Sequence, residues 1–137
     1  MEPEHKIALS IRRLEIAEER LKTAKHNLEF GDYKAAANRL YYAIFSAMRA
    51  VLALDGFDSK KHSGIISEFR RKYIKNNIFA PEMSDIIGEL EIIRENSDYD
   101  DFYIISKEDV IKQSINAEFF VCQVKAYLLY RYDEQTK

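Results

Sequence analysis

One arginine stands alone in an acidic stretch of this 137-residue sequence. From Pro81 to Asp101 there are eight acidic residues and a single basic one, Arg94, so the local formal charge is −7. A guanidinium in such surroundings can neutralise its acidic neighbours at the C-terminal end of a helix. It can also receive an anion through charge-assisted hydrogen bonds, which are the strong ones. The residues alone leave both interpretations open.

Among the three histidines, His62 has the position that best suits chemistry. His5 and His26 stand among charged residues of a predicted helix and are expected to face solvent. His62 follows Lys60 and Lys61 at a predicted helix start, where the helix dipole disfavours the charged imidazole. It is either a residue that bonds locally at the helix start, which is a common arrangement, or a proton-transfer group.

A polar seam lies on the second predicted helix. Its members are spaced by three, four and three residues, which places them on one side of a helix: Arg39, Tyr42, Ser46 and Arg49. The seam is either a solvated side, where arginine stems cover apolar surface, or a groove in which Arg39 and Arg49 hold an anion or nucleotide. Lys61 is a further candidate ligand for such an anion.

The region around Lys61 is basic. From Asp58 to Asn77, six lysines or arginines accompany two acids, a local charge of +4. Such a run is usually a solvated face that pairs with an acidic one. It could also contact phosphates, but without interleaved aromatic residues its nucleic-acid signal is weak.

Composition excludes several classes of function. The net charge is −2, so the protein as a whole has no electrostatic attraction to nucleic acid or anionic lipid. There is no glycine-rich phosphate loop, no His-Glu-x-x-His pair and no cysteine cluster, so neither a metal nor a cofactor is expected. The single cysteine, Cys122, fits a reducing cytoplasm. No apolar run has the length of a membrane span or a signal segment, and we expect a cytoplasmic protein without membrane contact.

The elements that carry these residues are predicted to be helices. Only four glycines and two prolines occur, and apolar spacings of three and four predict helices over about 4–30, 33–54, 62–75, from Pro81 to about Arg94, and 106–132. Gly31 should end the first helix, Asp32 cap the second and Ser106 cap the last. We therefore expect one all-α domain over 1–137, an antiparallel up-and-down bundle of about five helices.

Two helices have further features. The second carries a strip of alanines, where a neighbouring backbone can approach closely: Ala36, Ala43, Ala47 and Ala50. The last is apolar nearly all round from Ala117 to Leu129, which predicts a central position and a homodimer that buries the surplus apolar surface. The polar segment from Glu95 to Asp101 is predicted to lie outside the helix interior.

Four blocks of the sequence, taken in order, resemble the HEPN family, in a branch of small helical proteins. The resemblance covers about Glu15 to Leu128, and the blocks are Ala37–Ala43 followed by Arg49-Ala50, Lys61–Gly64, Arg94 followed by Ser97–Asp100, and Ala117–Phe120. It implies a helical bundle that dimerises. Many members are metal-independent ribonucleases, often toxins paired with a small nucleotidyltransferase antitoxin encoded beside them.

The resemblance also implies a motif, an arginine followed after four to six residues by a histidine. The arginine would steady phosphate charge and the histidine would move the proton of a ribose hydroxyl. Arg94 matches the arginine, but Tyr99, Asp100 and Asp101 occupy the three histidine positions, and no histidine follows His62. A tyrosine hydroxyl, with an ordinary pKa near 10, is a poor base at neutral pH.

Three hypotheses follow. The first is a dimeric binding or regulatory component of a toxin–antitoxin or defence-type system with a degenerate motif. The second is an active metal-independent endoribonuclease using Arg94, Tyr99 and His62. The third is a structural protein-interaction module. The expected partners are a second copy of the chain, a nucleotidyltransferase-type antitoxin, and RNA or a nucleotide.

Overall fold

The computed structural model describes residues 2–135 and shows five α-helices, with no strand in that part of the chain. Their bounds are α1 Pro3–Glu29, α2 Tyr33–Leu54, α3 His62–Phe69, α4 Glu82–Tyr99 and α5 Lys107–Gln135, and a π-helical turn, η1 Arg70–Ile74, directly continues α3. The all-α prediction is therefore confirmed. In the same residues, no helix combines the length and apolar character that crossing a bilayer requires.

Helices α1 and α2 form an antiparallel hairpin closed by the residues that the sequence indicated. Gly31 has a φ of 78°, a left-handed conformation that glycine adopts without steric cost. The Asp32 carboxylate accepts a hydrogen bond from the Ala35 backbone N–H at 3.4 Å and so caps α2. The alanine strip is fully buried. Ser10 of α1 donates a hydrogen bond to the Ala50 carbonyl at 2.6 Å, which demonstrates the close approach of the two helices.

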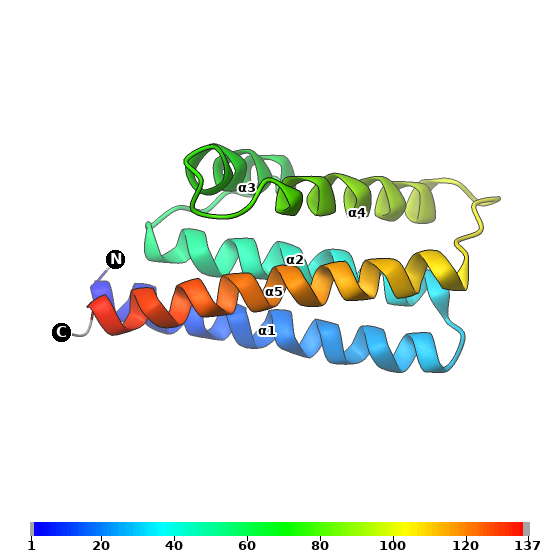
Figure 1. The fold of residues 1–137 in the computed structure, drawn as a ribbon, viewed down its shortest axis with the longest axis horizontal. Coiled ribbons are helices and arrows are strands. Elements are labelled where there is room, and N and C mark those ends of the chain that lie inside the picture. The colour runs from blue at the N-terminus through cyan, green and yellow to red at the C-terminus, as the bar shows by residue number, and fades with distance from the viewer. Residues whose placement is uncertain (1, 136–137) are drawn as a thin grey trace.

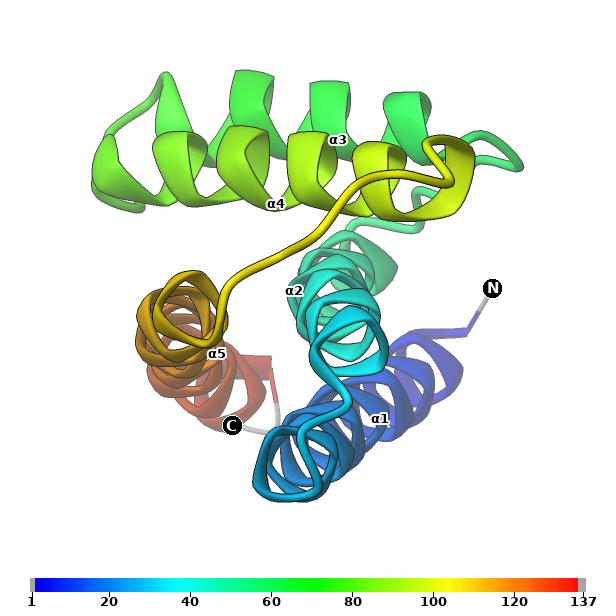
Figure 2. The same ribbon diagram turned by 90° about the vertical axis from the view of Figure 1, so that its right-hand side faces the viewer.

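Helix α2 is the centre of the molecule. Fourteen of its 22 residues are buried, and it packs against α1, α3, α4 and α5. Figures 1 and 2 show the three long helices α1, α2 and α5 side by side, with α3 and α4 lying obliquely across α2 and α5. This crossing brings the start of α3 and the second half of α4 to the same side of α2.

A polar network anchors the C-terminal end of the α3 segment, by which we mean α3 together with η1. The Tyr73 hydroxyl donates to the Asp55 carboxylate at 2.6 Å, and Arg131 of α5 donates to the Tyr73 oxygen at 3.3 Å and ion-pairs with Asp55 at 3.6 Å. Lys72 adds a second ion pair to Asp55 at 3.2 Å. The network joins η1 to the end of α2 and to α5, so the path of α3 over α2 is fixed at its C-terminal end.

Helix α4 is longer than the sequence predicted. The segment after Arg94 was expected to leave the helix, but α4 continues to Tyr99. An ion pair between Arg94 and Asp98, four residues apart with 3.5 Å between Nε and Oδ2, supports the additional turn. The prediction was wrong because it counted the polar residues without their contacts.

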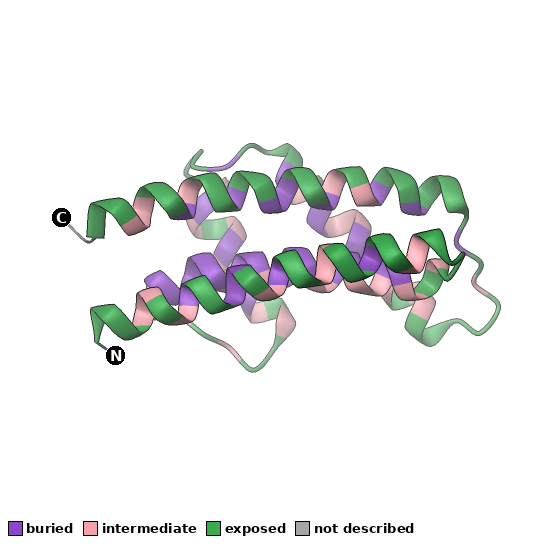
Figure 3. Ribbon diagram, turned by 90° about the horizontal axis from the view of Figure 1, so that it is seen from below, coloured by how far each residue is buried: buried purple, intermediate pink, exposed green. Residues whose placement is uncertain are grey.

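Helix α5 begins as predicted, since the Ser106 hydroxyl accepts a hydrogen bond from the Asp109 backbone N–H at 3.1 Å. Its predicted central position is wrong, because only one face of the helix is buried. Figure 3 shows exposed residues along the opposite side. An apolar stripe runs along this outer face of α5 and includes Ile111, Ile115, Phe119, Leu129 and Tyr130.

Candidate functional site

The crossing of α3 and α4 over α2 brings three predicted site residues into one cavity. His62 at the start of α3, and Arg94 and Tyr99 on the last turns of α4, line a cavity of about 190 Å³. We call this cavity the Arg94 cleft, and the rest of its lining is Tyr41, Glu91 and Glu95. Tyr99 lies at its rim with 77% of its surface exposed.

Two tyrosines of α2 hold the Arg94 guanidinium in place. Its central carbon lies 5.0 Å from the ring centroid of Tyr41 and 5.5 Å from that of Tyr42, both within cation–π range. One terminal nitrogen, Nη2, donates to the Tyr42 hydroxyl at 3.3 Å. The buried Nε makes its ion pair with Asp98 but no hydrogen bond. The guanidinium is thus fixed in orientation with donors left over for an anion.

The electrostatics of the cleft keep Arg94 charged. Burial would lower the pKa of Arg94, but its interactions with Tyr42, Tyr41 and Asp98 outweigh burial and raise it. Burial raises the pKa of Tyr41 to about 12, with Glu91 and Tyr42 acting in the same direction and Arg94 against them. Tyr41 therefore stays a neutral hydroxyl that can donate or accept a hydrogen bond.

His62 is oriented by aromatic neighbours and by one hydrogen bond. Its ring packs against Phe45 with 4.2 Å between centroids, and its Nδ1 lies 3.2 Å from the Tyr41 hydroxyl. Burial lowers the pKa of His62, and the positive charges of Arg94 and Arg49 lower it further. The imidazole is therefore neutral at pH 7. In the tautomer whose Nδ1–H donates to Tyr41, Nε2 is free to accept a proton.

Gly64 explains why the chain can place His62 here. A Cβ at position 64 would lie 2.9 Å from the Ser59 Cβ and would collide with its hydroxyl. Ser59 Oγ in turn accepts a hydrogen bond from the Lys61 backbone N–H at 3.2 Å. The loop before α3 therefore folds closely over the first helical turn, and this sets the position of the His62 backbone.

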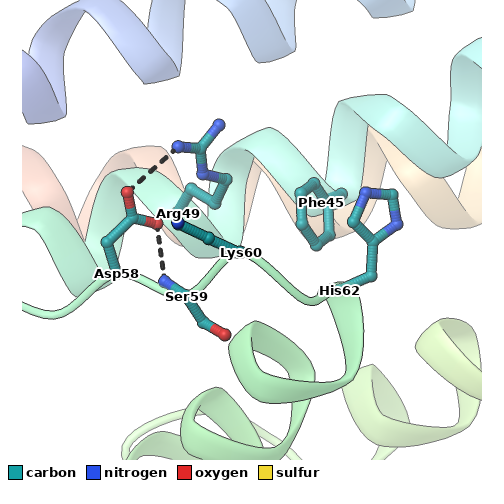
Figure 4. Close-up of a pocket in the computed structure, with 6 residues that line it drawn as sticks. All are labelled: Phe45, Arg49, Asp58, Ser59, Lys60 and His62. Carbon is teal, nitrogen blue, oxygen red and sulfur yellow. Dashed lines mark hydrogen bonds and ion pairs between the residues drawn. The ribbon is translucent and has the colours of Figure 1, made fainter.

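A larger cavity of about 660 Å³ adjoins the cleft. We call it the Lys60 cavity; Figure 4 shows its lining, which is Phe45, Arg49, Asp58, Ser59, Lys60 and His62. Asp58 forms ion pairs of 3.4 Å with both Arg49 and Arg13. Burial opposes ionisation of Asp58, but the Ser59 N–H, Arg49 and Arg13 outweigh it and lower the pKa of the carboxyl. His62 lines both cavities.

The structure places the other predicted anion ligands differently. Arg49 lines the Lys60 cavity, but Arg39 lines neither cavity and donates to its neighbour Asn38 at 2.9 Å. Lys61 is exposed and lines neither cavity, and its neighbour Lys60 takes the position expected of it. Of the two arginines in the polar seam, therefore, only Arg49 lines a cavity of the site, while Tyr42 of the same seam contacts Arg94.

The residues of the site that the sequence did not indicate include Tyr41 and Lys60. Helical spacing places Tyr41 on the apolar face of α2, where the structure buries it, but spacing does not indicate what its hydroxyl contacts. Within residues 2–135, no group of three or more histidine, cysteine or acidic side chains is arranged to hold a metal ion. The chemistry that these side chains offer is anion binding by Arg94 and proton transfer by His62.

Comparison with known sequences gives a family match over most of the chain and relatives that match it over most of their own length. Residues 11–128 match the HEPN domain family. A protein of Methanocaldococcus jannaschii named "putative toxin" is 32% identical over 118 residues, which cover 85% of this chain and 79% of that protein. A UPF0332 protein of Archaeoglobus fulgidus is 34% identical over 116 residues, or 82% of this chain and 90% of that one.

A solved structure shares the fold. The crystal structure of a HEPN domain protein from Thermotoga maritima superimposes with a TM-score of 0.54 and covers 92% of this chain and 98% of its own. The two sequences are 20% identical, so this likeness concerns the fold alone.

Proposed function

This chain belongs to the HEPN domain family, and from that premise we propose that it is a toxin-type endoribonuclease whose proton-transfer histidine, His62, comes from α3. The observation that carries the proposal is the meeting of Arg94 and His62 in one cleft. The family motif places its histidine four to six residues after the arginine. Here a second helix supplies the imidazole, and Tyr99 occupies the motif position.

The proposed reaction is cleavage of RNA by its own 2′-hydroxyl. Nε2 of His62 accepts the 2′-hydroxyl proton, the 2′ oxygen bonds to the adjacent phosphorus, and the bond from phosphorus to the next 5′ oxygen breaks. The products are a 2′,3′-cyclic phosphate and a 5′-hydroxyl. Arg94 stabilises the charge that develops on the phosphate oxygens, since its guanidinium is already oriented by Tyr41 and Tyr42.

Tyr99 has two roles in this proposal. Its hydroxyl lies at the rim of the cleft, where it can donate a proton to the leaving 5′ oxygen. Its exposure also makes it accessible to a nucleotidyltransferase partner, which would inactivate the toxin by transferring a nucleotidyl group to this hydroxyl. We expect such an antitoxin to be encoded beside this protein and both to act in the cytoplasm.

We also propose that the protein is a homodimer. The outer face of α5 supports this, because its exposed apolar side chains continue along the helix from Ile111 to Tyr130. Contiguous apolar surface of this kind is typical of an interaction site. A second copy related by two-fold symmetry would cover it with the same residues.

The test is cleavage of single-stranded RNA by the wild type and Arg94→Ala in the presence of a chelator at low salt. We expect the wild type to give 2′,3′-cyclic phosphate ends and Arg94→Ala to give none while remaining folded. Arg12→Ala is a matched control, because Arg12 is an exposed α1 arginine whose ion pair is with Glu19. Absence of cleavage by the wild type would contradict the proposal.

A second candidate function is RNA or nucleotide binding without cleavage, as a regulatory component. The observation that favours it is Tyr99, which stands where the family motif has a histidine. This candidate predicts that the wild type binds RNA, that Arg94→Ala does not, and that neither cleaves it.

A further inference from the structure

The two cavities of the site are joined by a single side chain. His62 lines both the Arg94 cleft and the Lys60 cavity. Arg94 lines the cleft and Arg49 lines the Lys60 cavity, so each cavity brings an arginine near the imidazole, and both arginines lower its pKa. A ligand centred on His62 would therefore lie between Arg94 and Arg49. This arrangement suits a ligand that carries more than one phosphate, such as a nucleic acid strand.

The Lys60 cavity has cations available for such a phosphate. Among the described residues none ion-pairs with the Lys60 ammonium, which lies on an exposed loop residue. Arg49 shares Asp58 with Arg13, and the Arg13 side chain is 10% exposed whereas that of Arg49 is 35% exposed. A phosphate can therefore take over Arg49 while Arg13 keeps Asp58 ion-paired.

The two cavities have sizes that fit different parts of a nucleic acid strand: the smaller one fits a phosphate and the larger one fits a nucleotide. The Arg94 cleft, at about 190 Å³, is large enough for a phosphate and the edge of a ribose. The Lys60 cavity, at about 660 Å³, is within the range of about 300–1,000 Å³ that holds whole small molecules. Figure 4 shows Arg49 and Asp58 toward one end of this cavity and Phe45 and His62 toward the other.

We propose that the Lys60 cavity is a substrate subsite that binds the nucleotide next to the cleaved bond of single-stranded RNA, with Lys60 and Arg49 on its phosphate. This inference rests on the proposed function and names its substrate class. The strand has to be single because a base can enter a cavity only when it is unstacked and unpaired. A duplex would present phosphates to Lys60 but could not place a nucleotide inside.

The test measures binding, which does not depend on cleavage. The probes are fluorescein-labelled 2′-O-methyl RNAs, whose blocked 2′ position prevents the reaction: a dinucleotide with one phosphodiester, a hexanucleotide, and a blunt duplex of the same sequence. The variants are Lys60→Ala, Arg49→Gln and Arg94→Ala. Lys75→Ala is the matched control, since Lys75 is also exposed and lies at the other end of the α3 segment.

We expect Lys60→Ala and Arg49→Gln to weaken hexanucleotide binding roughly tenfold while leaving dinucleotide binding unchanged. The slope of log affinity against log salt for the hexanucleotide should fall by about 0.7 for each phosphate contact removed. Arg94→Ala should weaken both probes, and Lys75→Ala neither. The duplex should bind more weakly than the hexanucleotide.

Three results would overturn the subsite. One is an equal effect of Lys60→Ala and Lys75→Ala, another is an equal loss of dinucleotide and hexanucleotide, and the third is tighter binding of the duplex. The fate of the ribonuclease proposal is read separately from unmodified RNA. If the wild type cleaves RNA and Lys60→Ala leaves KM unchanged, only the subsite proposal is contradicted. If the probes bind as predicted but unmodified RNA is not cleaved, only the ribonuclease proposal is contradicted.

Discussion

The Tyr41 hydroxyl lies 3.2 Å from Nδ1 of His62, so a buried residue of the central helix α2 determines how the imidazole at the start of α3 is held. The same tyrosine ring also lies under the Arg94 guanidinium. One side chain therefore contacts both groups that the proposed reaction requires: its ring makes the cation–π contact with Arg94, and its hydroxyl makes the hydrogen bond with His62.

Changing Tyr41 to phenylalanine should separate these two roles. The ring under Arg94 remains, but His62 loses the hydrogen bond that selects its tautomer and orientation. We expect kcat for RNA cleavage to fall roughly tenfold, the equivalent of about 1.4 kcal/mol, with little change in KM. Tyr33→Phe is the control, because Tyr33 lies at the first turn of α2 and lines neither cavity. An equal kcat for both variants would show that this hydrogen bond does not position His62.

The pH dependence of the site follows from the charges beside His62. Its pKa lies below the ordinary 6.5 because of burial, Arg94 and Arg49, so activity should be constant near neutrality and fall only as the pH drops through that lowered value. In the unfolded chain His62 has its ordinary pKa and binds a proton more readily than in the folded protein. His62 therefore makes folding less favourable as the pH falls below 6.5.

Arg49→Gln should move the His62 pKa upward, since it removes one of the two positive charges. The measurement is an NMR titration of the imidazole signals, with the exposed His26 as internal reference. A His62 pKa that is unchanged in Arg49→Gln would mean that Arg49 does not face the imidazole.

Gly64→Ala tests how the loop positions His62. The new methyl group would collide with Ser59, and we expect a loss of about 1–3 kcal/mol in the free energy of unfolding together with reduced cleavage. The double variant Gly64→Ala with Ser59→Gly removes the collision and should recover most of both. Denaturant unfolding and cleavage rates are the measurements. Failure of Ser59→Gly to improve either would show that Ser59 is not the constraint.

The proposed dimer can be tested through the outer face of α5. We expect light scattering to give the mass of a dimer at tens of micromolar, and Phe119→Asp to give a monomer because it places a charge in the middle of this apolar face. Lys22→Asp, on the exposed side of α1, provides a control with a changed charge elsewhere. A monomeric wild type would contradict the dimer, and a dimeric Phe119→Asp would place the interface on another face.

Much of the fold was predictable because it depends on local patterns. Apolar spacing gave the five helices, and the short polar side chains of Asp32 and Ser106 marked two helix starts. The end of α4 was not predictable from composition, since the turn after Arg94 is held by its contacts with Asp98 and with the rings of α2. Similarly, the apolar pattern of α5 did not reveal that one of its faces is exposed.

The site was predictable as a set of residues but not as an arrangement. Arg94, Tyr99 and His62 were identified from their types and surroundings, yet no local pattern states that α3 and α4 cross α2 at the same place. Which of the two neighbouring lysines, Lys60 or Lys61, lines the cavity depends on how the loop folds over Gly64. Two adjacent residues of the same type give no sequence signal that distinguishes them. The Tyr41 hydroxyl was missed because periodicity assigns a whole residue to a face, whereas a tyrosine has an apolar ring and a polar end.

The most direct test of the central claim, that His62 replaces the missing motif histidine, is the single-turnover rate of RNA cleavage by His62→Ala at pH 7 with a chelator present. His26→Ala is measured beside it, because His26 is an exposed histidine of α1. We predict that His62→Ala cleaves at least about 100-fold more slowly than the wild type, as expected for loss of a general base, while His26→Ala is unchanged and both remain folded. A His62→Ala variant that cleaves RNA at the wild-type rate would contradict the account.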